Sequence, residues 1–73
     1  MNSIDFNIDD IIIRTYKNYY FIYKIISVDT LFYTMVALKS NCMIISSIAY
    51  NTCKSIINSD FRLLTDLEKI KYL

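Results

Sequence analysis

The 73-residue sequence contains no glycine, no proline, no histidine and no tryptophan. Without glycine there is no Walker loop and no dinucleotide-binding turn, because both motifs need glycines that let the backbone approach phosphate. Without histidine there is no Ser–His or Cys–His relay and no imidazole ligand for a metal. These absences exclude most enzyme classes. We therefore predict a non-enzymatic protein with no catalytic residues, no metal site and no cofactor.

The chain carries almost no net charge, since eight basic and seven acidic residues give +1. Non-specific nucleic-acid binders usually have a clear basic excess, so nucleic acid is not the expected partner. The apolar stretches are interrupted by Lys24, Asp29 and Lys39 and fall short of the ~20 apolar residues that cross a bilayer. Met1–Asp5 lacks the basic start and apolar core of a signal peptide. A cytoplasmic location is expected, in the host cell if the protein is viral.

Hydrophobic residues make up 55% of the chain, above the ~45–50% usual for soluble domains. We interpret residues 1–73 as one small domain, and a domain this short buries only ~60% of its unfolded surface. Its interior cannot hide all of its apolar groups, so the surplus stays exposed or meets a partner. A homodimer or a complex with a host protein is expected.

The stretch Tyr19–Leu38 has the pattern of a β-hairpin, because two β-branched and aromatic runs flank a polar break at Ser27–Thr30. Strands are predicted at Tyr19–Ile26 and Leu31–Lys39. The charge of Lys24 should face water, which orients the first of these strands. The residues predicted to point inward are Phe21, Tyr23 and Ile25, and those predicted to point outward are Tyr20, Ile22 and Ile26. The faces of the second strand stay open.

Shorter strands are predicted on either side of the hairpin. Ile11–Arg14 is the first, followed by a loop in which Asn18 takes the conformation that glycine would normally adopt. Ile4, Phe6 and Ile8 alternate with polar residues, as in an edge strand or a lead-in to the next strand. The other predicted strands are Cys42–Ile48 and Lys54–Ile57, with residues 49–52 either a turn or more strand. One helix over Ile48–Ile57 is the alternative.

The C-terminal residues predict a short helix from Asp66 to Tyr72. Thr65 and Glu68 have the spacing of a capping box, in which each side chain bonds the other residue's backbone N–H. An apolar stripe follows at helical spacing, formed by Leu64, Leu67, Ile70 and Leu73. The fold class is therefore mainly β, with four or five antiparallel strands and a C-terminal helix.

The sequence around Ile8–Leu38 resembles SH3-like barrels, in which a strand begins after an Asp and a long second hairpin follows. The stretch Phe61–Glu68 is similar to the endings of many small phage-encoded proteins. These resemblances imply a small, strongly bent barrel from a phage or mobile element. They also imply, by analogy, an inhibitor that covers a site on a host defence protein, such as an anti-CRISPR protein.

Aromatic residues crowd the first half of the chain and suggest a contact surface. The hypothesis we favour is a protein-binding surface on the outer face of the hairpin, formed by Tyr20, Ile22, Tyr33 and Tyr16. The alternative is a small-barrel nucleic-acid-binding protein using Arg14, Lys17 and Lys24. The structural interpretation, which the aromatic series by itself favours, places half of the rings in the core and the rest in a dimer seam.

The acidic residues and the cysteines have simpler explanations than a site. Asp5, Asp9 and Asp10 lack calcium-loop spacing and fit polar strand boundaries. Cys42 and Cys53 cannot close a tetrahedral zinc site by themselves, and we interpret them as small buried or half-buried residues.

Overall fold

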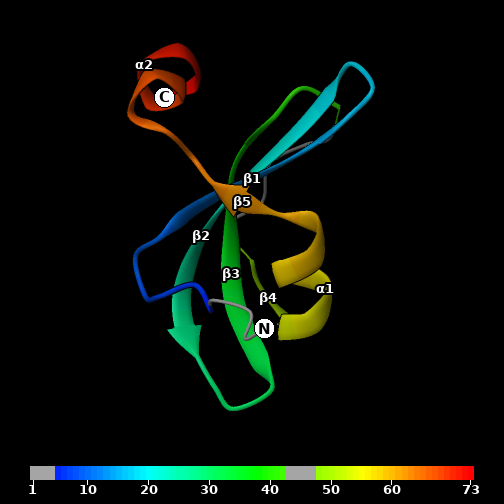
Figure 1. Ribbon diagram of the computed structural model, residues 1–73, viewed down its shortest axis with the longest axis vertical. Helices are drawn as coiled ribbons and strands as arrows, with labels where there is room; N and C mark the ends of the chain where they lie inside the picture. Colours follow the sequence, from blue (N-terminus) through cyan, green and yellow to red (C-terminus); the bar gives the residue numbers. More distant parts are fainter. Residues whose placement is uncertain (1–4, 43–47) are drawn as a thin grey trace.

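The computed structural model describes residues 5–42 and 48–73 (Figure 1). It contains one sheet of five strands in the order β4-β3-β2-β1-β5, with every neighbouring pair antiparallel. The elements are β1 (Ile11–Tyr16), β2 (Tyr19–Val28), β3 (Phe32–Ser40), β4 (Ala49–Cys53), α1 (Lys54–Asp60), β5 (Arg62–Leu63) and α2 (Asp66–Tyr72). The prediction of a mainly β, antiparallel domain with a short C-terminal helix is confirmed.

Strands β1 and β2 form a tight hairpin. Tyr16 pairs with Tyr19, which leaves only Lys17 and Asn18 in the turn. Strand β1 therefore runs two residues beyond the predicted end at Arg14. In this turn the residue with a positive φ is Lys17, at 56°, and not Asn18 as predicted. A two-residue hairpin turn with a positive φ at only its first central residue is of type II′.

Two bulges divide the β2–β3 ladder. Ile25 pairs with Met35 but Ser27 pairs with Thr34, so Ile26 is an extra residue of β2. A second shift, between Ile22 and Tyr23, makes Leu38 an extra residue of β3. Each bulge reverses the alternation of side chains along its strand. Simple alternation therefore cannot assign both ends of the hairpin correctly.

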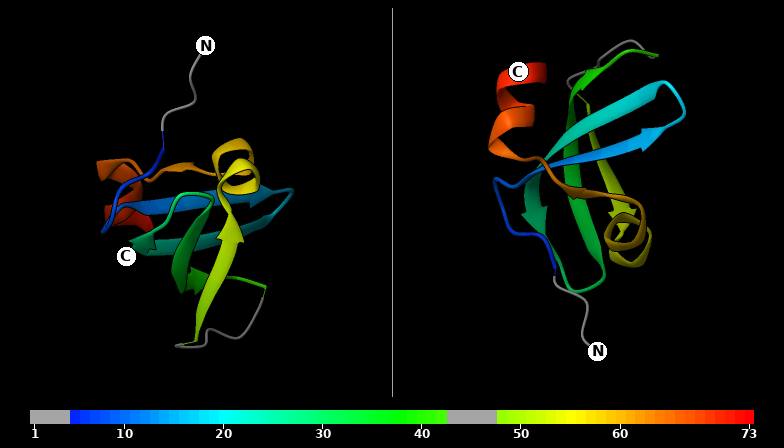
Figure 2. Two further views of the ribbon diagram at one scale, coloured as in Figure 1. Left: turned by 90° about the horizontal axis from the view of Figure 1, so that it is seen from below. Right: turned by 45° about the horizontal axis from the view of Figure 1, so that its top comes forward.

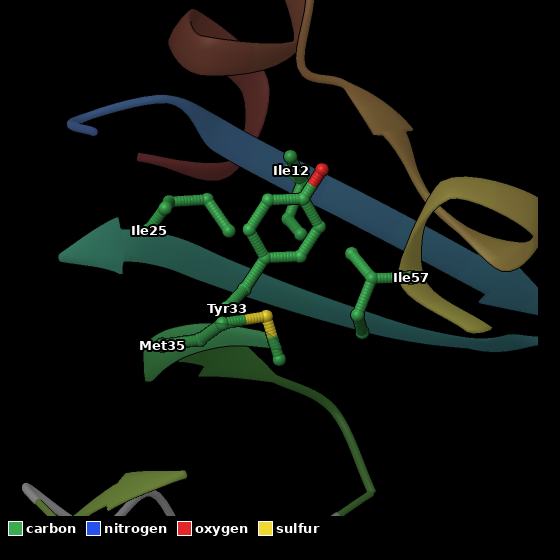
Figure 3. Packing of buried hydrophobic residues seen from close by; sticks show 5 residues of the cluster. All are labelled: Ile12, Ile25, Tyr33, Met35 and Ile57. Carbon is green, nitrogen blue, oxygen red and sulfur yellow. The ribbon is translucent and has the colours of Figure 1, made fainter. Parts of the chain in front are cut away.

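Each face of the sheet is covered over part of its area, and a core cluster lies beneath each covered part. The first cluster, on the α1 side, consists of Ile12, Ile25, Tyr33, Met35 and Ile57 (Figure 3). The second, on the α2 side, consists of Ile13, Ile22 and Leu64, with Tyr20, Leu38 and Tyr72 packed against it. Neighbouring residues Ile12 and Ile13 point to opposite faces of β1, and both are buried. The prediction that Ile22 faces outward into solvent is wrong because Leu64 and Tyr72 cover that face.

The region after β3 departs from the predicted strands. Lys54–Ile57 is not a strand but the first part of helix α1, and the helix does not begin at Ile48 as in the alternative. Residues 49–52 belong to strand β4. Most of the predicted strand Cys42–Ile48 falls on residues 43–47, outside the described residues, and its two ends are not in a strand.

Helix α2 has the predicted bounds and the predicted capping box. The Glu68 N–H donates to Thr65 Oγ1 at 3.2 Å, and the Thr65 N–H donates to Glu68 Oε1 at 3.0 Å. Figures 1 and 2 show α2 near one end of the sheet, well separated from α1. In the described part of the chain, neither helix is long and apolar enough to cross a membrane.

Candidate protein-binding face

The four residues predicted to bind a partner do not form one surface. Tyr33 and Ile22 are fully buried, on opposite faces of the sheet. Tyr20 is half-buried, with its ring centroid 4.6 Å from that of Tyr72. Tyr16 is exposed beside the β1–β2 turn. The proposed placement is therefore wrong for Ile22 and Tyr33, whose side chains no partner can reach in this structure.

Tyr33 has a structural role that its aromatic neighbours in the sequence did not reveal. Its ring fills the first core cluster, and its hydroxyl accepts the Phe6 N–H at 2.9 Å and donates to Asn58 Oδ1 at 2.7 Å. Asn58 Nδ2 and Lys54 Nζ both donate to Asp5, each at 3.0 Å. These two donors, Lys54 first, lower the pKa of the Asp5 carboxyl. The network fixes the segment before β1 against α1.

The basic residues of the nucleic-acid hypothesis are also separated. Arg14 pairs with Phe21 on the face of the first core cluster, whereas Lys24 pairs with Ile11 on the opposite face. Both cations have acidic neighbours: Arg14 Nη1 lies 4.0 Å from Asp60 and Lys24 Nζ lies 3.6 Å from Asp9. The third cation, Lys17, lies in the β1–β2 turn with its Nζ 5.4 Å from the centroid of the Tyr16 ring. The three cations form no continuous basic strip.

A different part of the hairpin presents apolar side chains to solvent. We define the outer sheet face as the side of β2, β3 and β4 opposite α1, at the end of the sheet not covered by α2. The ladder pairs Ser27 with Thr34, Thr34 with Asn51, and Val36 with Ala49 on this side. Its members are Ile26, Phe32, Thr34, Val36, Ala49 and Asn51. Ile26 and Phe32 are 41% and 46% exposed, and polar residues lie among them, with Lys24 opposite Val36 and Ser27 opposite Thr34. The face therefore offers accessible apolar side chains within a mixed surface.

The outer sheet face ends at an open strand edge. Strand β4 is the last strand in the sheet order, and within the described chain it pairs only with β3. Its first three residues are exposed. The Thr34 hydroxyl donates to the Asn51 side chain at 2.6 Å, and this bond links β3 to β4 on the outer sheet face. An open edge offers backbone N–H and C=O groups to an added strand.

The two cysteines differ in environment. Cys42 is exposed, contrary to the expectation of burial, whereas Cys53 is half-buried at the start of α1. Cys53 Sγ lies 3.2 Å from the Ser55 hydroxyl, and this hydrogen bond lowers the pKa of the thiol. Among residues 5–42 and 48–73, no group of three Cys, Asp or Glu side chains is arranged to hold a metal ion.

Comparison with protein-family models, with curated proteins and with solved structures finds no match to this chain. The resemblances to SH3-like barrels and to phage proteins remain predictions from the sequence.

The sequence interpretation expected apolar side chains on the outer face of the hairpin, and the structure exposes a different set of residues there. The outer face of Tyr19–Leu38 carries the exposed apolar side chains of Ile26 and Phe32 and the half-buried Val36. Ile26 was assigned outward, and the structure confirms this. For Phe32, the signal that could have been used was the alternation along the predicted strand Leu31–Lys39, whose inward and outward faces were left unassigned. Placing Tyr33 and Met35 inside would have put Phe32, Thr34 and Val36 outside.

Proposed function

We propose that this protein is a non-enzymatic protein-interaction module that binds a partner protein through the outer sheet face and the edge of β4. The observation that carries the proposal is a pair of exposed apolar side chains, Ile26 and Phe32, next to a strand edge that pairs with no other strand among residues 5–42 and 48–73. Apolar contacts supply affinity when they leave water. The open edge lets an extended segment of the partner add to the sheet and fixes its register. The lack of histidine and glycine supports a binding role over a catalytic one.

The finer role of this module is part of the same proposal. An inhibitor of the anti-CRISPR kind covers a site on a host defence protein. It needs only a small rigid domain with one binding surface. The size of the chain and the similarity of its C-terminal stretch to phage-encoded proteins support this role. The partner would then be a host protein.

The test compares matched variants of the tagged protein as bait in a host lysate. The double variant F32K/A49K places two charges on the outer sheet face, at exposed positions that leave the core intact. The control I56K makes the same kind of change at a comparably exposed position on α1. We expect one protein to be retained by the wild type and by I56K and lost with F32K/A49K.

A second measurement locates the contact. When the retained protein is purified and added, the amides of Ala49–Cys53 should exchange with solvent more slowly, because an added strand would bond to them. A partner that binds F32K/A49K as well as the wild type contradicts the proposal. Retention of nucleic acid alone, released steeply by salt, would favour the alternative function.

A further inference from the structure

Helix α2 presents its apolar side to solvent and its polar side to the protein. Leu67 and Ile70 are 80% and 81% exposed, the highest values among large hydrophobic residues in the described part of the chain. Leu73 and the preceding Leu63 are also exposed. The helix contacts the body through Glu68 and Tyr72 instead. A surface helix normally turns its apolar stripe toward the core, so the orientation of α2 is inverted.

Specific bonds hold the helix in this orientation. The Arg62 guanidinium donates to both oxygens of Glu68, each at 2.6 Å. Lys39 Nζ donates to the Tyr72 carbonyl at the other end of the helix. The capping box adds a third constraint at Thr65. Rotating Leu67 and Ile70 inward would break the Arg62–Glu68 and Lys39–Tyr72 bonds, and none of the residues that the structure describes covers the stripe.

The charges beside the stripe indicate what covers it. At about 100° per residue, Asp66 and Lys69 lie on one flank of the stripe, and Glu68 and Lys71 lie on the other. Each flank therefore has its acid in the first turn and its base in the last turn. Glu68 is engaged by Arg62, so the charges offered to a partner are Asp66 and Lys69, which lie 3.9 Å apart in one helix. When a second α2 packs on the stripe in the opposite direction, Asp66 of each helix faces Lys69 of the other. A parallel arrangement would bring like charges together.

We propose that two copies of this chain associate through α2, with the two helices antiparallel about a two-fold axis between Leu67 and Ile70. A two-fold axis makes the contact self-complementary: Leu67 of each copy packs against Ile70 of the other, and Asp66 of each approaches Lys69 of the other. The stripe is small, so the association is a monomer–dimer equilibrium. It uses a surface separate from the outer sheet face and does not rest on the proposed function.

The experiment is sedimentation equilibrium of the full chain from about 10 μM to about 1 mM, the range in which small interfaces dissociate. We expect the wild type to dimerise over this range and L67S/I70S to weaken the dimer at least about 100-fold, because exposed apolar area is removed from both copies. The matched control L31S/I56S changes two exposed apolar residues elsewhere and should dimerise like the wild type.

Charge reversal tests the antiparallel arrangement. D66K and K69D each place like charges on one flank and should weaken the dimer by about 2- to 30-fold, whereas D66K/K69D restores the attraction and the dimer. Circular dichroism verifies that each variant keeps its helix. A wild type that stays monomeric throughout, or a dimer that L67S/I70S and L31S/I56S weaken equally, overturns the proposal. A double reversal that fails to restore the dimer overturns the antiparallel arrangement.

Discussion

Replacing Tyr33 with phenylalanine removes the hydroxyl that bonds Phe6 and Asn58 and tests whether this hydroxyl is structural. The ring itself stays in place, so no cavity of consequence opens. The Phe6 N–H loses its acceptor and the Asn58 side chain loses a donor. Each hydrogen bond contributes about 0.5–1.5 kcal/mol, so Y33F should lower the free energy of unfolding by about 1–3 kcal/mol.

The assay is urea denaturation, which measures the midpoint and the m-value together. We expect the midpoint to fall with an unchanged m-value, and Tm to fall by about 4–8 °C per kcal/mol. The matched control is Y16F, at a tyrosine that is 55% exposed and should change stability by less than about 0.5 kcal/mol. If Y33F is as stable as Y16F, the hydroxyl network does not hold the N-terminal segment and the argument fails.

The same reasoning explains why a serine at this position could not test binding. Y33S would empty a buried site at a cost of about 3–5 kcal/mol, which is comparable with the ~3–5 kcal/mol that a core of this size supplies. Loss of binding in such a variant would report unfolding. Substitutions at Phe32, the exposed neighbour of Tyr33, avoid this ambiguity.

Two further predictions concern the α2 side of the sheet. Arg62 lowers the pKa of Glu68 from 4.5 to about 2, so this carboxylate stabilises the fold fully above pH 4.5 and progressively less as the pH falls toward 2. In urea titrations between these pH values, the free energy of unfolding of E68Q should fall less than that of the wild type. Parallel pH profiles of the two proteins would contradict the pairing. In the same assay, I13A should lower the free energy of unfolding by about 2–5 kcal/mol. The control I8A, at a residue 57% exposed, should lower it by under about 1 kcal/mol. Equal losses of stability would show that the second core cluster is not packed.

The features that the sequence predicted well are those decided within a few residues. The capping box of α2 needs only Thr65 and Glu68, and both side chains form the expected bonds. The β2–β3 hairpin follows from two β-branched, aromatic runs around a polar break. These local preferences agree with the final structure, so reading them in isolation succeeds.

The features that the sequence could not predict depend on contacts between distant residues. Alternation assumes one buried face, but Ile12 and Ile13 are both covered, and the extra residues Ile26 and Leu38 shift the alternation along β2 and β3. Helix α1 contains adjacent β-branched residues, has no side-chain cap and buries only Ile57. Tertiary packing thus overrides local propensity there. The residues assigned to the candidate binding face depended on which side chains were taken to point outward, so they changed when the bulges and the second buried face became known.

The pairing of β5 with β1 has a consequence for synthesis on the ribosome. Ile12 pairs with Leu63, and Ile13 shares its core cluster with Leu64, so about 50 residues separate the two sides of that cluster. At about 5–20 residues per second, Ile13 is made roughly 3–10 s before Leu64. During most of that interval both faces of the nascent hairpin are bare, because Ile57 of the first core cluster is made only seven residues before Leu64. The last strand to emerge therefore completes the fold, and until then Ile13 and Ile22 are part of the surface that a chaperone would meet.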